Sequence, residues 1–283
     1  MKDLTTKYID VNGILWKMYQ GALISENPPH VDITLSDKEI KHLLHASSAW
    51  FIRWPSEWDK DKESLWWYVI KDAFGGLEEL SGNTRSKVRR SFKRQDFRKV
   101  DPEIISEQAY DVYCEAFNSY KTHLKPLSEN DFKHYVLSLD TEIWDFFAAF
   151  DKESNVMTAY SQNLVLNDAA EYKIIKLHPG YLRNYSSYGL IYRMNEYYLK
   201  EKELKYVNDG SRSIAHDTNI QDFLIKKMKF RKAYCRLNVR YRACLGFFIR
   251  LLYPFRKVFR SGKISVFKKL SVLLKQEEIR RKS

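Results

Sequence analysis

The chain has 283 residues, of which 44% are hydrophobic, so it can bury a sizeable core and is neither a disordered segment nor a small disulfide scaffold. Its net charge of +12 originates in residues 226–283, where 19 Lys and Arg stand against 2 Glu, which predicts an anionic partner such as a membrane surface or a nucleic acid. Three cysteines without metal-ligand spacing, the lack of an apolar leader and the lack of a run of about 18 apolar residues predict a cytoplasmic protein with no metal site and no spanning helix.

The first 80 residues are expected to form a β-rich lobe with one helix. Strands are predicted at residues 14–19, 50–54 and 65–70, where apolar and aromatic residues cluster. A helix is predicted from Ser36, because Ser36 and Glu39 have the spacing of a capping box. Two consecutive glycines at residues 75 and 76 and the polar segment after them place a domain boundary near residue 80.

A strongly cationic helix is expected next. Residues 85–94 hold six basic residues and no acid, while Val88 and Phe92 are four apart and can dock one face of the helix against a core. The cationic face is either simply solvated or contacts an anionic donor or carrier. Two more helices are predicted at residues 107–121 and from Ser128, where apolar residues recur at spacings of three and four.

The periodicity then changes to two, which predicts antiparallel strands at residues 144–150, 156–165 and 171–177. A helix is predicted at residues 187–199. After it, a strand that begins at Tyr206 leads into a polar loop, a further helix and a last strand that ends near Tyr241.

The order of these elements, with two stretches of sequence, resembles the GNAT-type acyltransferases, in the branch grouped with the Fem-type aminoacyl and peptidyl transferases of cell-wall synthesis. LSGNTRSKVRRSFKR (residues 80–94) is similar to that family's basic opening helix, and SYGLIYRMNEYYLKEKELKYVNDGSRS (residues 187–213) to its helix and following strand with a terminal Asp-Gly pair. The resemblance, which covers about residues 65–242, implies an α/β (α+β) fold with a GNAT-like core over 81–242, in which helices flank a mixed, largely antiparallel sheet. The residues outside it predict a β-rich lobe over 1–80 and a helical basic tail over 243–283.

The resemblance also implies acyl or aminoacyl transfer to an amine or hydroxyl, by direct attack on a bound thioester or ester, with acetyl-CoA or another acyl-CoA as donor and no metal. In this family the donor's phosphates lie at a helix N-terminus, where free N–H groups and the helix dipole favour anions. The matching turn contributes Arg183, Asn184, Ser186, Ser187 and Gly189, and Ser186 or Ser187 is expected to cap the helix. The family's coenzyme A signature has glycine at the place of Ser186, and glycine or alanine at that of Tyr188, so this chain departs from it.

The polar loop after residue 208 is the predicted reaction centre. His216 is the candidate general base and Asp209 the candidate orienting group or acceptor-amine ligand, while Ser211 and Arg212 suit a phosphate or carboxylate of the substrate. Each residue also has a structural interpretation: His216 bonds within the loop, Asp209 belongs to an Asn-Asp-Gly turn, and Arg212 is solvated. Asp217 or Thr218 is expected to cap the following helix.

Three functions follow from the resemblance and the charge. The first is an acyltransferase with a small-molecule or sugar-linked acceptor, for example a cell-surface polysaccharide or cell-wall precursor, held at the inner face of the membrane. The second has aminoacyl-tRNA as the donor, since two cationic regions suit a nucleic acid. The third is a non-catalytic, degenerate GNAT fold that binds membrane or nucleic acid.

The tail is expected to be a pair of amphipathic, cationic helices. On a helical wheel, the side chains of one half are apolar and those of the other half are basic: Ile264, Val266, Phe267, Leu270, Leu273 and Leu274 against Lys268, Lys269 and Lys275. Together with residues 245–259, this pattern predicts a peripheral anchor on an anionic membrane surface. The alternative is a pair of helices packed on the chain's own domain or in a partner's groove. A chain that ends at Arg242 is expected to stay folded.

Overall fold

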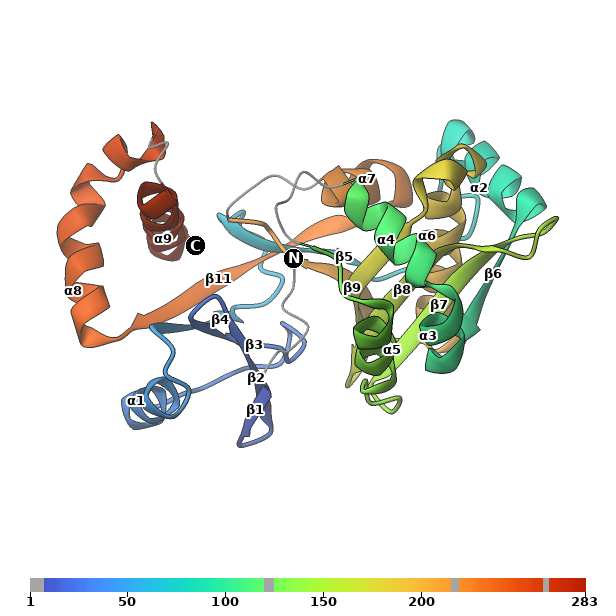
Figure 1. Cartoon of the computed structure of the whole chain (residues 1–283). Coiled ribbons are helices and arrows are strands. Elements are labelled where there is room, and N and C mark those ends of the chain that lie inside the picture. Colours follow the sequence, from blue (N-terminus) through green and yellow to red (C-terminus); the bar gives the residue numbers. More distant parts are fainter. Residues whose placement is uncertain (1–7, 120–124, 215–218, 262–264) are drawn as a thin grey trace. The chain divides into compact units, whose positions relative to one another are not determined.

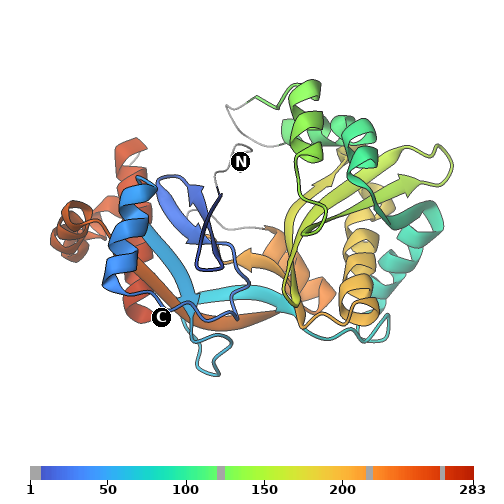
Figure 2. The same ribbon diagram turned by 90° about the horizontal axis from the view of Figure 1, so that it is seen from below.

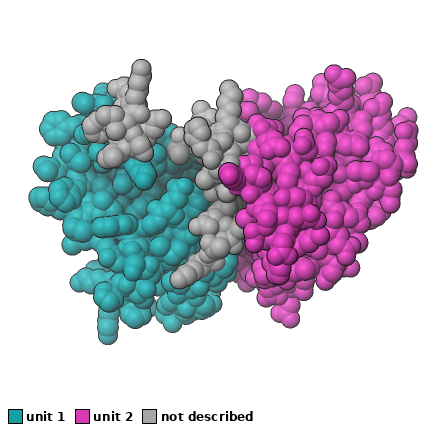
Figure 3. Space-filling model, viewed as in Figure 1, with its two compact units in different colours: residues 1–68, 211–218, 232–283 teal, residues 69–210, 219–231 magenta. Residues whose placement is uncertain are grey.

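The computed structural model is seen from two sides in Figure 1 and Figure 2. It describes residues 8–119, 125–214, 219–261 and 265–283; of residues 260, 261 and 265–268 it describes the backbone but not the side chains. The chain forms two compact units (Figure 3): unit 1 comprises residues 1–68, 211–218 and 232–283, and unit 2 comprises residues 69–210 and 219–231. These bounds differ from the predicted divisions at residues 80 and 242, because the last strand and the tail pack with the N-terminal lobe.

Unit 1 is built on a sheet whose neighbouring strands are β1 (Tyr8–Val11), β2 (Ile14–Tyr19), β3 (Ala22–Ser25), β4 (Phe51–Ser56) and β11 (Arg231–Tyr241), in that order. Only β3 and β4 run parallel. β5 (Trp66–Lys71) begins in unit 1 and ends in unit 2. The predicted strands and the β-rich character of the lobe are confirmed, while the short strands β1 and β3 were not predicted.

Helix α1 (Asp37–Ala46) begins where the sequence predicted. Ser36 Oγ accepts a hydrogen bond from the Glu39 amide, and Glu39 Oε2 accepts one of 2.8 Å from the Ser36 amide, so the capping box is confirmed. The apolar face of α1 buries Ile40 and Leu43 in a cluster with Trp16, which positions the helix on the sheet.

The tail consists of α8 (Ala243–Leu252), two short 3-10 turns, η3 (Tyr253–Phe255) and η4 (Val258–Ser261), and α9 (Ser265–Lys282). Ile279 of α9 is 2% exposed and shares a core cluster with Leu237 and Val239 of β11. The packed alternative is therefore correct for α9. This packing argues against the expectation that a chain ending at Arg242 stays folded, because the loss of α9 would uncover this core.

Unit 2 holds a second sheet, whose neighbouring strands are β10 (Tyr206–Ser211), β9 (Ala169–Leu177), β8 (Met157–Leu166), β7 (Trp144–Asp151) and β6 (Gln95–Val100), in that order. Neighbours are antiparallel except β9 and β10. The mixed, largely antiparallel sheet and the three-strand meander β7–β8–β9 are thus confirmed.

Helices cover both faces of this second sheet (Figure 2). On one face lie α3 (Pro102–Gln108), α4 (Tyr110–Asn118) and α5 (Glu129–Leu137), which bury Val112 and Phe132 against Tyr160 of β8. On the other lie α2 (Gly82–Arg94) and α6 (Ser186–Glu196), and α6 continues into a π-helical turn, η2 (Tyr197–Glu201). α7 (Asn219–Met228) follows β10 in the chain, and its N-terminal cap falls outside the described residues.

In unit 2 one predicted helix differs at its start and one strand was missed. The helix expected over residues 107–121 is confirmed as α4 over 110–118, but residues 107 and 108 belong to the separate helix α3, which starts at Pro102, a position where a missing amide costs nothing. Strand β6 was not predicted, because its sequence QDFRKV buries only Gln95 and Phe97 and so lacks an apolar alternation.

Candidate functional site

The parallel strands β9 and β10 of unit 2 are paired over a short stretch only. Residues 206–208 of β10 pair with residues 169–171 of β9, and β9 then continues to Leu177 beside β8. Where two neighbouring strands part, their backbone N–H and C=O groups are available to a ligand instead of to each other. This opening is the candidate site.

A β-bulge lies in β9 just beyond the point of separation. Gln162 of β8 is opposite Ile174 and Asn163 is opposite Tyr172, so Lys173 is an extra residue. The bulge reverses the alternation of side chains: Tyr172 donates a 2.8 Å hydrogen bond to Asn195 of α6, whereas Ile174 packs with the α3–α5 cluster on the other face. Bulges re-aim side chains and are common next to active sites.

Three charged residues gather at this opening. Lys173 Nζ lies 2.8 Å from Glu171 Oε2, and the Lys173 side chain is only 7% exposed. A Cβ added to Gly210 would lie 3.4 Å from Glu171 Oε1, so the Glu171 carboxylate rests against the end of β10. Burial and, second, the charge of Asp209 raise the pKa of Tyr172 well above its ordinary value, which places Asp209 near the same strand and keeps Tyr172 a neutral donor.

The Asn-Asp-Gly segment forms the turn that its sequence predicts. Gly210 has φ +83°, a conformation that favours glycine, and its amide donates a 2.9 Å hydrogen bond to Asn208 Oδ1. Asp209 is half-buried between these two residues. Its predicted partner His216 lies outside the described residues.

The predicted substrate residues Ser211 and Arg212 lie in unit 1. Ser211 ends β10 and is half-buried. The Arg212 amide donates to the Trp67 carbonyl at 2.9 Å, its guanidinium donates to the Leu65 carbonyl at 2.8 Å, and the same group lies over the Trp67 ring. Arg212 is therefore anchored to neighbouring backbone instead of being solvated, and its contact with a substrate stays a prediction.

The turn predicted to bind donor phosphates is formed by η1 (Pro179–Asn184), Tyr185 and the start of α6. Tyr185 is the N-cap residue, in a left-handed conformation with φ 61°, and no side chain caps the helix. Ser186 is buried and its Oγ accepts a 3.0 Å hydrogen bond from Gln95, so the predicted cap by Ser186 or Ser187 is wrong: Tyr185 occupies that position, and Ser187 is half-buried inside the first turn.

Gly189 allows α6 to approach its neighbours closely. A Cβ at this position would lie 2.2 Å from Phe97 Cζ of β6 and 2.5 Å from Ser91 Oγ of α2. Its amide donates to the Tyr185 carbonyl at 3.3 Å, and the residue is buried. The structure thus gives Gly189 a packing role, and this placement lends no support to its predicted phosphate contact.

Two tyrosines and a lysine cover the outer side of this turn. Lys87 Nζ of α2 lies 5.7 Å from the centre of the Tyr185 ring and 5.1 Å from that of Tyr188, and Tyr188 packs edge-on against Phe223. Both glycine places of the coenzyme A signature are therefore filled by side chains engaged in packing, Ser186 and Tyr188. A pyrophosphate cannot approach this backbone as closely as it approaches glycine.

Cations also surround the turn. Asn184 Oδ1 accepts a 2.8 Å hydrogen bond from Arg94 at the end of α2. Arg183 is exposed, and no hydrogen bond or ion pair joins its guanidinium to another of the described residues. Arg94 and Arg183 thus put positive charge beside the turn, and Asn184 is held by α2.

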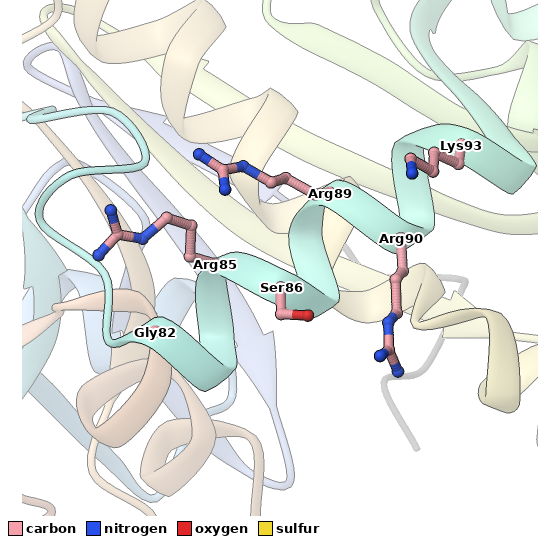
Figure 4. Close-up of a pocket in the computed structure, with 6 residues that line it drawn as sticks. All are labelled: Gly82, Arg85, Ser86, Arg89, Arg90 and Lys93. Atoms are coloured by element: carbon pink, nitrogen blue, oxygen red, sulfur yellow. The ribbon is translucent and has the colours of Figure 1, made fainter.

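The exposed face of α2 carries a cationic groove, shown in Figure 4. The groove has a volume of about 400 Å³ and is lined by Gly82, Arg85, Ser86, Arg89, Arg90 and Lys93. Arg85 pairs with Glu78 at 2.7 Å, whereas Arg89, Arg90 and Lys93 have no carboxylate partner among the described residues. Val88 is 1% exposed on the opposite face and Phe92 packs on Phe97, so the predicted docking of this helix is confirmed.

His178, at the end of β9, has both ring nitrogens engaged. Nδ1 accepts a 3.1 Å hydrogen bond from the Gly180 amide, and Nε2 lies 3.3 Å from Asp111 Oδ2 of α4. A histidine held in this way fixes the start of η1 and offers no free nitrogen as a base.

Within residues 8–119, 125–214, 219–261 and 265–283, no three His, Cys, Asp or Glu gather as metal ligands, and no helix is long and apolar enough to cross a membrane.

The sequence named Asp209 but missed Glu171 and Lys173. In the sequence these two look like polar residues on the outward face of a strand, and no local signal reveals the bulge. Only the parallel pairing of β9 with β10, whose residues lie far apart along the chain, brings them beside Asp209.

Comparison with known proteins shows what the fold is similar to. No family model matches the sequence, and no curated protein matches it. The solved structure of FemX aligns with 88% of this chain and 90% of its own at 10% identity and a TM-score of 0.55. The C-terminal domain of a putative lysylphosphatidylglycerol synthetase from Agrobacterium fabrum aligns with 92% of this chain and 90% of its own at 13% identity and a TM-score of 0.52.

A tandem GNAT protein from the clavulanic acid biosynthesis pathway aligns with 81% of this chain and 78% of its own, at 8% identity and a TM-score of 0.45. The likeness to FemX and to the synthetase domain covers both units and shows that the chain shares the fold of these two solved structures, as the resemblance to the Fem-type transferases predicted.

Proposed function

We propose that the chain is an acyl or aminoacyl transferase whose reaction takes place at the opening between β9 and β10. The observation that carries the proposal is the early separation of these strands, with the Lys173 bulge and the carboxylates of Glu171 and Asp209 beside it. A bound carbonyl that accepted hydrogen bonds from β9 amides beyond the pairing with β10 would have its oxyanion stabilised as the acceptor attacks.

In the proposed reaction, a neutral amine or a hydroxyl of the acceptor attacks the donor's carbonyl carbon. A C–N or C–O bond forms, the bond from the carbonyl to the donor's oxygen or sulfur breaks, and the proton lost by the acceptor ends on the leaving group. Asp209 and Glu171 are the carboxylates that would hold the acceptor amine and take its proton, with Lys173 fixing Glu171. His216 remains a candidate for the base.

Of the two donor classes, an aminoacyl ester carried by RNA is favoured over an acyl-CoA. Ser186 and Tyr188 fill the places at which glycine lets a backbone approach the pyrophosphate of coenzyme A. At the same time Arg89, Arg90 and Lys93 form a run of cations without a carboxylate partner in the part of the chain that the structure describes, which suits the repeated phosphates of a nucleic acid. Acyl-CoA is kept as the second candidate, since the exposed Arg183 has no hydrogen-bond or ion-pair partner among the described residues and can bind a phosphate.

For the acceptor, we propose an amine or hydroxyl of a cell-wall or surface-polysaccharide precursor. The support is the resemblance of residues 80–94 and 187–213 to the Fem-type transferases, together with the fold shared with FemX.

The deciding experiment compares donors directly. Thermal unfolding of the protein is followed with acetyl-CoA, longer acyl-CoAs, uncharged tRNA and tRNA charged with radiolabelled amino acids, because a ligand of the native state raises the unfolding temperature. We expect stabilisation by charged tRNA and transfer of label to an envelope-precursor amine. Stabilisation by acyl-CoA alone would replace the favoured donor with the second candidate. Binding without transfer from any donor would support the non-catalytic, degenerate fold instead.

A further inference from the structure

An apolar stripe runs along α8 and the two turns after it. Five large apolar side chains of this segment are 56% to 71% exposed: Phe247, Phe248, Leu251, Phe255 and Val258. Within α8, their spacing puts Phe247, Phe248 and Leu251 on one side of the helix, while Ile249 is 2% exposed and faces inward; Phe255 and Val258 follow in η3 and η4. The other exposed large apolar residues described are spread singly along the chain, so this contiguous stripe is unusual.

The stripe is not the face by which the tail holds itself to unit 1. That attachment is made by Ile279 and the partly buried Val272 and Leu273 of α9, together with Leu245 near the start of α8, and within the tail Arg281 lies over the Tyr253 ring. α8 forms the outer margin of unit 1 in Figure 1, with α9 on its inner side. The exposed aromatic side chains therefore add nothing to the folded core, although exposing each of them to water is unfavourable in free energy.

A basic groove lies directly beside the stripe. It has a volume of about 390 Å³, Phe247 belongs to both features, and the rest of its wall is rich in arginine: Arg240, Arg250, Arg280 and Arg281, with Glu277 among them. Arg280 and Arg281 are bound to Glu277 at 2.7 and 2.8 Å. Arg240 and Arg250 are exposed and have no carboxylate partner among the described residues. Two guanidinium groups are thus free for an anion, which arginine binds bidentately when it is a phosphate.

We propose that α8 and this groove form a docking site for an anionic phospholipid surface. The stripe enters the boundary between headgroups and acyl chains, and Arg240 and Arg250 receive a lipid phosphate at its edge. Charge identifies the occupant: residues 243–283 hold 11 Lys and Arg against 2 Glu, which complements an anionic bilayer. The inference narrows the predicted membrane anchor from the whole tail to α8, and it does not depend on the donor or the acceptor.

The test is co-sedimentation of the full chain with phosphatidylcholine vesicles that contain or lack phosphatidylglycerol. We expect binding only to the anionic vesicles, weakened about tenfold or more by Phe248→Ser/Leu251→Ser and by Arg240→Gln/Arg250→Gln. The matched control is Leu137→Ser/Leu182→Ser, which removes two apolar side chains that are 51% exposed in unit 2, and it should bind as the wild type does. All four changed side chains of the test variants are exposed, so these variants should keep the wild-type melting temperature.

Cys244 provides a reporter at the site itself. It is exposed near the start of α8, whereas Cys235 is buried in unit 1. Phosphatidylglycerol vesicles should slow alkylation of Cys244 by a charged maleimide, and the arginine variant should restore the rate. Equal binding to both kinds of vesicle, unchanged binding by both double variants, or self-association through the stripe without vesicle binding would overturn the proposal.

Discussion

Two regions of the molecule are strongly cationic, and they differ in what lies beside the charge. In unit 2, Arg89, Arg90 and Lys93 lie on the exposed face of α2. The apolar side chains of this helix are on its other face and point inward. In unit 1, Arg240 of β11 and Arg250 of α8 lie beside Phe247 and the rest of an exposed apolar stripe. Net charge alone would assign both regions to one partner. The neighbouring apolar surface separates them, because phosphates of a nucleic acid need only charge whereas a bilayer also receives apolar side chains.

The largest effect is expected on the rate of transfer, from a change at the proposed reaction centre, which lies in unit 2. Asp209→Asn should lower kcat about 100-fold or more if Asp209 takes a proton in the transition state, with a smaller change in KM. Steady-state transfer kinetics with the donor that proves active measure this. The control is Lys38→Glu/Lys41→Glu on the exposed side of α1 in unit 1, which should leave kcat unchanged. An effect of Asp209→Asn confined to KM would make Asp209 a binding residue.

The next effect separates the two cationic regions. Arg89→Glu/Arg90→Glu should weaken binding of tRNA roughly 30-fold at moderate salt, since two phosphate contacts are replaced by repulsion, and should leave vesicle binding as it is. Filter binding and vesicle co-sedimentation on the same preparation test both statements. Lys38→Glu/Lys41→Glu makes the same change of charge away from the groove. Equal losses in the double variant and this control would mean that the protein's overall field, and not the α2 groove, binds RNA.

Two glycines inside helices test how tightly α6 and α8 are packed against their neighbours. Gly189→Ala puts a Cβ within 2.5 Å of Phe97 and Ser91 atoms, so it should destabilise the fold by about 1–3 kcal/mol. Gly246→Ala in α8 meets only the Tyr241 Cβ, at an ordinary 3.4 Å, and should stabilise the helix by about 0.5–1 kcal/mol. Urea unfolding of both variants measures the difference. A neutral Gly189→Ala would refute the close packing of α6 on α2.

The smallest effect concerns acid. Burial acts to raise the pKa of Glu277, but hydrogen bonds from Arg280 and Arg281 outweigh it, so the pKa is lowered below that of an ordinary glutamate. Because the pKa of Glu277 is lower in the folded protein than in the unfolded chain, its ionised carboxylate stabilises the fold fully above the unfolded-state pKa of about 4.3. This stabilisation is lost as the pH falls through the folded-state pKa. Glu277→Gln should therefore flatten the acid limb of the stability curve. The exposed Glu107→Gln serves as the control, and identical acid limbs in the two variants would contradict the assignment.

Local signals in the sequence predicted the parts of the fold that depend on local physics. The capping box at Ser36 and Glu39 fixed the start of α1 because its hydrogen bonds join residues three apart. The meander was predictable because three short stretches rich in apolar residues follow one another in the sequence and are separated only by short turns. Strand β6 was missed because Gln95 is buried through hydrogen bonds to Thr158 and Ser186, which lie far away in the chain.

The candidate site was predictable only in part, for the same reason. Asp209 was named because it lies in a loop rich in polar residues and matches the Asp-Gly pair of the resembled family, both of which can be read from a short stretch of sequence. Glu171 and Lys173 became candidates only through a bulge and a parallel pairing, which depend on β8 and β10. In the tail, hydropathy marked both helices as amphipathic but could not tell that α9 buries its apolar face on β11 while α8 leaves its own exposed.

The interleaving of the two units sets an order of assembly during synthesis. All residues of unit 2 have been made once Arg231 is added, whereas unit 1 needs residues 232–283 to complete a sheet that its first 68 residues begin. Until β11 arrives, β4 lacks its antiparallel neighbour on one side, and an unpaired strand edge is a template for aggregation. A slow stretch of translation after residue 231 would prolong that exposure, so the yield of soluble protein should depend on how quickly the last part of the message is read.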